Sequence, residues 1–140
     1  MDEAMWSKMH GAAVHFPIAL VACSGALDAL GVLSRRPALR VGLHSAGYWA
    51  LLAGALGTLP AVVSGLVMTR GVLLGHGALR SHHLFVWPAF ALIVGLAGWR
   101  SFSADFTARG TALGYLSAVG VATALVLGAG YWGGEMLLGQ

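Results

Sequence analysis

Histidines are the side chains of this sequence best suited to chemistry, and there are six of them in 140 residues. Imidazole is a common ligand of transition metals and of haem iron, so histidines that meet in the fold predict such a site. The six lie at His10, His15, His44, His76, His82 and His83. What they can do depends on the elements that carry them.

The composition predicts that membrane-spanning helices carry these histidines. Apolar residues make up 58% of the chain and charged residues only 9%, whereas soluble domains carry about 25% charged residues. The mean hydropathy is +0.79. So few charges exclude a disordered chain and a nucleic-acid-binding domain, and the single cysteine excludes a disulfide scaffold.

Four apolar stretches are long enough to cross a bilayer, which takes about 20 residues of helix. In lipid, helices satisfy every backbone group within one segment. We expect spans at about residues 12–33, 41–69, 82–99 and 111–132. Residues 1–140 are therefore predicted to form a single transmembrane domain, an all-α, up-down four-helix bundle. The two hairpins are of similar size but their motifs do not match, and no repeat of about 20–50 residues stands out.

Lys and Arg residues predict the orientation, since they favour cytoplasmic loops. Five flank the 1–2 and 3–4 connections, namely Arg35, Arg36, Arg40, Arg100 and Arg109. Three lie at the other face, namely Lys8, Arg70 and Arg80. Both chain termini are thus expected outside the cytoplasm.

His15 and His83 are the predicted metal ligands, as the axial pair of a haem b. The first and third spans run in the same direction and lie diagonally in an up-down bundle, so the two rings enter the membrane at comparable depth. Two such imidazoles can hold a haem iron between helices. Because His82 and His83 differ by about 100° around a helix, only one of them is expected to point inward.

Further residues on the same face are predicted to support this cofactor. Arg70 and Arg80 could pair with the haem propionates. His10 and Glu135 are expected around the ligands, where Glu135 could accept a ring N–H and fix the tautomer of a ligand. The alternative is that these histidines are interfacial residues without a cofactor. An imidazole has an apolar and a polar part, which suits the boundary between lipid and water.

The sequence also predicts two further polar sites, formed by other residues. Asp28, His44 and Tyr48 are predicted at the opposite face, as a proton relay or quinone head-group site, or as a hydrogen-bonded pair that fastens the hairpin. A stripe of Met1, Met5, Met9 and His10 at helical spacing suits copper, or an amphipathic helix on the membrane surface.

The segment His10-Gly-Ala-Ala-Val-His-Phe-Pro-Ile-Ala-Leu20 resembles the start of a family of small bacterial membrane proteins, catalogued as domain of unknown function 2231. That family typically has four spans, a histidine at the head of the third and a Gly-Gly-Glu stretch near its end. His83, or His82 one residue away, and Gly133-Gly134-Glu135 match these features. The resemblance implies a bacterial membrane location, and fusions to cytochrome-like modules in the family point toward a redox role.

Together these observations predict a multi-pass protein of the bacterial inner membrane with both termini in the periplasm. We expect a non-catalytic, haem-b-binding subunit that moves electrons between a periplasmic redox protein and quinone or a larger membrane complex. Its predicted partners are thus lipid, redox proteins and quinone, and no nucleic acid. The alternative is a cofactor-free accessory subunit of a larger complex.

Overall fold

The computed structural model describes residues 3–102 and 109–138, which form four α-helices. They are α1 (Glu3–Leu33), α2 (Pro37–Met68), α3 (Gly77–Phe102) and α4 (Arg109–Leu138). All four are long and apolar enough to cross a membrane, which confirms the predicted all-α membrane bundle. α1 and α2 begin before their predicted spans, and α3 and α4 extend beyond theirs at both ends. Apolar composition marks only the part of a helix that hydrocarbon requires, whereas helical hydrogen bonding can continue past it.

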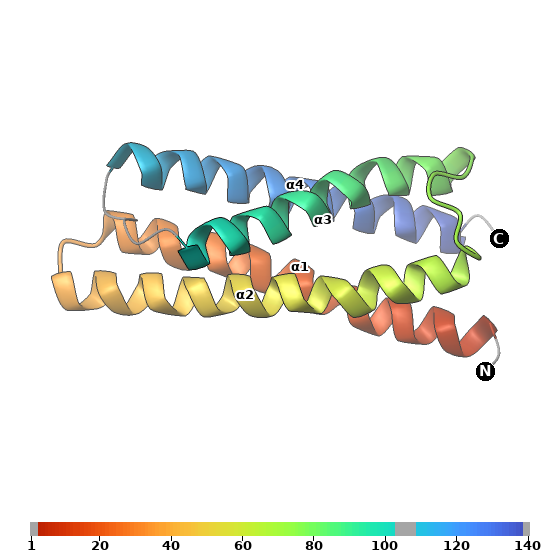
Figure 1. The fold of residues 1–140 in the computed structure, drawn as a ribbon, viewed down its shortest axis with the longest axis horizontal. Coiled ribbons are helices and arrows are strands. Elements are labelled where there is room, and N and C mark those ends of the chain that lie inside the picture. Colours follow the sequence, from red (N-terminus) through yellow and green to blue (C-terminus); the bar gives the residue numbers. More distant parts are fainter. Residues whose placement is uncertain (1–2, 103–108, 139–140) are drawn as a thin grey trace.

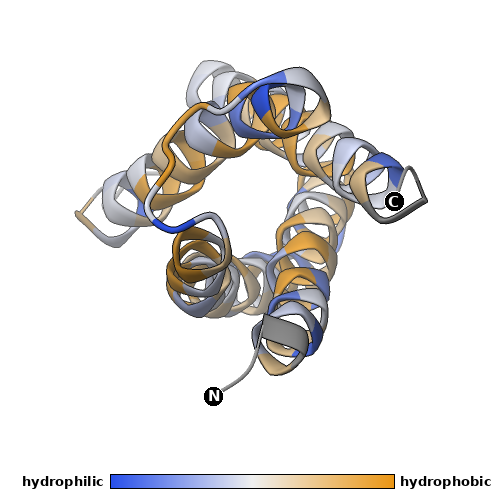
Figure 2. Cartoon of the chain, turned by 90° about the vertical axis from the view of Figure 1, so that its right-hand side faces the viewer, coloured by the Kyte–Doolittle hydropathy of each residue, from blue (hydrophilic) through white to orange (hydrophobic). Residues whose placement is uncertain are grey.

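The helices run alternately up and down and surround a common axis (Figures 1 and 2). α1 packs mainly on α2 and α3 mainly on α4, while α1–α4 and α2–α3 contacts close the ring. α1 and α3 therefore lie diagonally opposite each other. The start of α1, the end of α4 and the α2–α3 connection lie at the end of the bundle on the right of Figure 1, which we call the terminal end.

Local signals set where α2 begins and ends. Pro37 occupies the first turn, where a missing N–H costs no hydrogen bond, and Arg36 before it is extended. After Thr69 the chain turns through two left-handed residues, Arg70 (φ 52°) and Gly71 (φ 80°). The Gly71 N–H bonds back to the Leu66 carbonyl at 2.8 Å, which closes the last turn of the helix.

The centre of the bundle contains one fully buried apolar residue from each helix. Val21, Leu51 and Ile93 are 0% exposed and Val119 is 1% exposed. Large apolar side chains such as Phe16 and Trp49 instead point outward, as expected where lipid is the solvent. Helices in lipid are held together by close packing rather than by the hydrophobic effect, so small residues at their contacts matter.

Gly54 is one such contact, and it gives a stability prediction. A Cβ at this position would lie 3.2 Å from Cγ2 of Val21 and 3.3 Å from Cβ of Leu20. We expect Gly54→Leu to push α1 away from α2 and to lower the free energy of unfolding in mixed micelles by about 1–3 kcal/mol. Gly95→Leu is the matched control, because a Cβ there meets nothing within 4 Å. Equal losses in the two variants would contradict the packing seen here.

Candidate cofactor site

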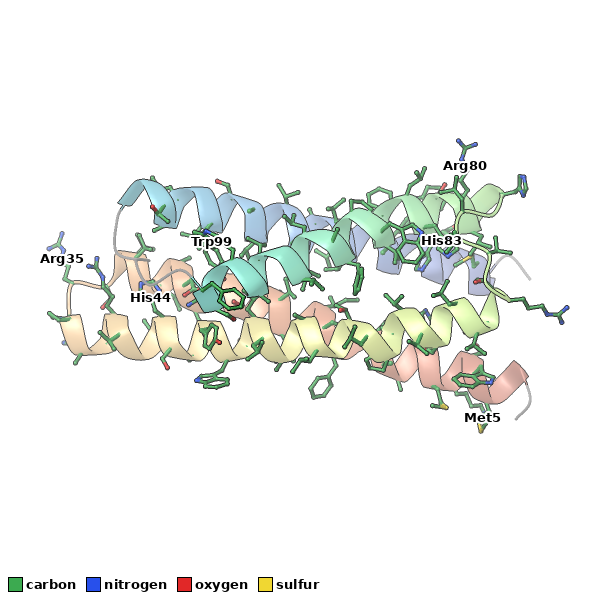
Figure 3. The ribbon with its side chains drawn as sticks, viewed as in Figure 1. Met5, Arg35, His44, Arg80, His83 and Trp99 are labelled. Carbon is green, nitrogen blue, oxygen red and sulfur yellow. The ribbon has the colours of Figure 1, made fainter. Side chains whose placement is uncertain are left out.

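The terminal end of the bundle holds a cavity of about 360 Å³ between the four helices. This volume falls within the range of about 300–1,000 Å³ that is typical of small-molecule sites. Most of the wall is apolar and includes Val14, Ile18, Val62, Val86, Phe90 and Val126. Four histidines also line it, His10 and His15 from α1 and His82 and His83 from α3. Figure 3 shows His83 inside this end of the bundle and Arg80 pointing away from it.

Hydrogen bonds to backbone carbonyls fix three of the four imidazoles. Nδ1 of His10 donates to the carbonyl of Ala61 at 3.0 Å, and Nδ1 of His82 donates to that of Ala129 at 2.7 Å. Nδ1 of His15 donates to Gly11 within its own helix at 2.5 Å. Because a carbonyl only accepts, Nδ1 carries the proton and Nε2 keeps its lone pair. This is the tautomer through which histidine ligates a metal from Nε2.

Two glycines make room for the rings of His10 and His82. A Cβ at Gly65 on α2 would lie 3.1 Å from Cε1 of His10. A Cβ at Gly133 on α4 would lie 3.5 Å from Nδ1 of His82. Each ring therefore lies against a glycine of the neighbouring helix. The carbonyl one turn before that glycine accepts the hydrogen bond from Nδ1–H of the ring.

His83 is the most buried of the four and has an unsatisfied nitrogen. Its side chain is 5% exposed, and its buried Nδ1 has no hydrogen-bond partner among the described residues. Its ring centroid lies 5.8 Å from that of His82 and 6.0 Å from that of Trp87. An unpaired buried polar atom costs about 1–3 kcal/mol. In a cavity wall, such an atom is available to water or to a polar group of a bound molecule.

The predicted pair of His15 and His83 thus lies at one cavity but in unlike settings. His15 is exposed and lines the mouth of the cavity, whereas His83 is buried. The prediction that only one of His82 and His83 points inward is wrong, because both line the cavity. His82 does so while its Nδ1 reaches the carbonyl of the adjacent α4.

The predicted supporting residues lie outside the cavity wall. Arg70, Arg80 and Glu135 are exposed, and none of them lines the cavity. Arg70 and Arg80 nevertheless lie at the terminal end, in or beside the α2–α3 connection. Their pairing with propionates, and the role of Glu135, stay predictions.

The number of nearby donors matters for the kind of cofactor. No group of three or more His, Cys, Asp or Glu within the described part of the chain could hold a metal ion. A bare zinc or copper site takes three or four protein ligands, whereas haem iron is held by its macrocycle and one or two axial ligands. The copper stripe begins at Met1, which lies outside the described residues, and Met9 does not line the cavity.

A buried polar cluster lies at the other end of the bundle. Asp28 is 0% exposed, and both of its carboxylate oxygens accept hydrogen bonds from the guanidinium of Arg100. Nδ1 of His44 donates to the same carboxylate at 2.8 Å. Arg100 also donates to the hydroxyl of Tyr115 at 2.7 Å and to the carbonyl of His44 at 2.5 Å. One residue from each of the four helices thus joins the cluster.

This cluster favours the fastening role over a relay or quinone site. Asp28 and His44 are in contact, and the cluster does not line the cavity. Tyr48 stands beside it, with its hydroxyl 3.2 Å from Oγ of Ser101 and its ring centroid 5.8 Å from Cζ of Arg100. A carboxylate hydrogen-bonded from two other helices holds the bundle together.

Arg100 lies inside the bundle and not in a loop, contrary to the prediction from the sequence. It was expected to end the third span as a loop charge, but α3 continues to Phe102 and Arg100 is only 9% exposed. It therefore no longer counts toward the orientation, and the Lys and Arg bias falls from five against three to four against three. The signal that could have found it is Asp28, because a carboxylate within a span requires a partner.

Four apolar helices around a histidine-lined cavity define an integral membrane four-helix protein. Residues 7–139 match the family DUF2231, described as a predicted membrane protein, and the chain belongs to this family. No curated protein matches the chain, and no solved structure does. The family description gives a membrane location and no activity.

Proposed function

We propose that this chain is a membrane subunit that binds haem b in the cavity at the terminal end and passes electrons. The observation that carries the proposal is the meeting of imidazoles from diagonal helices at one apolar cavity, with their tautomers fixed by backbone carbonyls. When bound, the haem supplies one-electron transfer. The chain supplies the ligands of the haem iron, the orientation of the haem and an apolar site that excludes water.

Each part of the cavity has a task in this proposal. The Nδ1–H bonds to Ala61 and Ala129 orient two rings and make Nε2 a better donor. Apolar walls such as Val86 and Phe90 exclude water, which tunes the reduction potential. Arg70 and Arg80, in or beside the α2–α3 connection at the terminal end, are the cations that would pair with the haem propionates.

The proposed redox partners depend on how the bundle is oriented in the membrane. In the topology that Lys and Arg favour, the terminal end faces the periplasm of a bacterial inner membrane. The electron donor or acceptor on that side is then a periplasmic redox protein. The other partner is the quinone pool or a larger membrane complex, which the apolar outer surface could contact within the bilayer.

Haem titration of the purified chain in detergent tests this proposal. Trp87 lines the cavity, so haem bound there should quench tryptophan fluorescence with saturation at about one haem per chain. A variant in which His10, His15, His82 and His83 are all alanine should lose saturable binding. His76→Ala is the control, because His76 is exposed and does not line the cavity. Identical titrations of the wild type and the fourfold variant would overturn the proposal.

A further inference from the structure

The two hairpins of the bundle repeat one another, although their sequences share little. In α1 and α3 the buried positions recur at a constant shift of 72 residues, the separation of Asp28 and Arg100. The matching buried pairs are Pro17 with Ala89, Val21 with Ile93, Ser24 with Leu96, and Asp28 with Arg100. The same turns of α1 and α3 therefore face the bundle axis in the same register.

Helices α2 and α4 repeat in the same way, at a shift of 68 residues, the separation of Ala61 and Ala129. The matching buried pairs are Gly47 with Tyr115, Leu51 with Val119, Gly54 with Ala122, Thr58 with Val126, and Ala61 with Ala129. Two hairpins with parallel directions and matching inner faces approximate a two-fold relation about the bundle axis, although α1 packs more extensively on α2 than α3 does on α4. This repeat lies in the register of the buried positions and not in matching motifs.

Equivalent positions meet across this axis at the buried cluster. Asp28 and Arg100 occupy the same position in α1 and α3, and their side chains are hydrogen-bonded to each other. Like charges at these two positions would repel each other in a buried site, so the two copies differ there in sign. The contact shows that inward-facing equivalent residues of the two hairpins come together on the axis.

His10 and His82 are a second equivalent pair. Each lies 18 residues before Asp28 or Arg100 in its own helix, toward the terminal end. Their surroundings repeat too, because the carbonyls that hold them belong to the equivalent Ala61 and Ala129. The glycines beside them, Gly65 and Gly133, are also related by the 68-residue shift. One imidazole site has therefore been kept in both hairpins.

The other two cavity histidines have no such counterpart. The position equivalent to His15 is Trp87, and the position equivalent to His83 is Gly11. Only His10 and His82 are equivalent histidines that line the cavity from opposite hairpins, each with Nδ1 bonded to an equivalent carbonyl. Nδ1 of His10 also lies 3.0 Å from Oγ of Ser64, where the equivalent position is Trp132.

We propose that His10 and His82, and not His15 and His83, are the two axial ligands of one haem iron placed on the two-fold axis. This assignment rests on the proposed haem binding. A macrocycle held by this pair would lie between the two hairpins. His83, with its unpaired Nδ1, then donates or accepts a hydrogen bond at the bound group without ligating the iron.

The spin state of the iron in single variants tests the assignment. Haem-loaded wild type should be six-coordinate and low-spin by electron paramagnetic resonance and absorption. His10→Ala and His82→Ala should each become high-spin, and added imidazole should restore the low-spin state. His15→Ala and His83→Ala should stay low-spin. Low-spin spectra in both His10→Ala and His82→Ala, or a switch to high spin in His15→Ala, would overturn the assignment.

Methionine variants keep the test decisive if an alanine variant fails to fold. His82→Met retains a side chain able to ligate iron, and a Met/His pair should raise the reduction potential while the iron stays six-coordinate. An unchanged potential in both His10→Met and His82→Met would overturn the assignment. A wild type that binds no haem overturns the proposed function itself, so the two failures are distinguishable.

Discussion

Asp28→Ala is expected to lower the free energy of unfolding by about 3–5 kcal/mol, the cost of removing one partner of a buried ion pair. The substitution leaves the guanidinium of Arg100 only 9% exposed and without its carboxylate. It also removes the acceptor of the His44 Nδ1–H. Reversible unfolding in mixed micelles, followed by circular dichroism, measures the loss.

A paired substitution separates the ion pair from general damage. Replacing Asp28 by leucine and Arg100 by methionine together should be far milder than Asp28→Ala, because apolar residues of similar volume leave no buried charge unpaired. Glu135→Ala is the single-carboxylate control, since Glu135 is exposed and surface changes stay within about 0.5 kcal/mol. Asp28→Ala with the stability of Glu135→Ala would contradict the fastening role.

Gly134→Phe is expected to weaken haem binding by blocking the cavity. Gly134 lines the cavity, and a Cβ added there meets nothing within 4 Å. A phenyl group in this space must be displaced before a haem enters, and overpacking costs about 1–3 kcal/mol, which corresponds to about 5- to 150-fold in affinity. Haem titration of the variant gives the affinity directly.

Gly114→Phe is the matched control for this prediction. It lies on the same helix, is exposed, and also has open space at its Cβ, but it does not line the cavity. Its affinity for haem should equal that of the wild type. Equal weakening in both variants would show that the phenyl group acts through the helix and not through the cavity.

The fold was predictable because lipid leaves few alternatives. The length of each apolar run determines where a helix can cross, and short connections make neighbouring helices antiparallel. The diagonal placement of α1 and α3 follows from these two facts. The exact ends of the helices could not be predicted, because apolar composition does not show how far a helix continues past its apolar part.

The site was less predictable because the sequence does not give the rotation of each helix. His10 was expected only as a supporting residue, yet its ring reaches the Ala61 carbonyl and lines the cavity. The 72-residue pairing of Asp28 and Arg100 is likewise a contact between distant segments. The repeat is not evident in the sequence because equivalent core positions keep their burial while their identities change, as Gly47 and Tyr115 do.

The optical spectrum of the purified full chain, air-oxidised and then reduced with dithionite, tests the haem proposal most directly. The account predicts a Soret band that shifts on reduction, a sharp α band and about one haem b per chain. It also predicts that the His10→Ala, His82→Ala double variant loses these bands while His76→Ala keeps them. A folded, colourless protein that stays colourless after haem is supplied would contradict it.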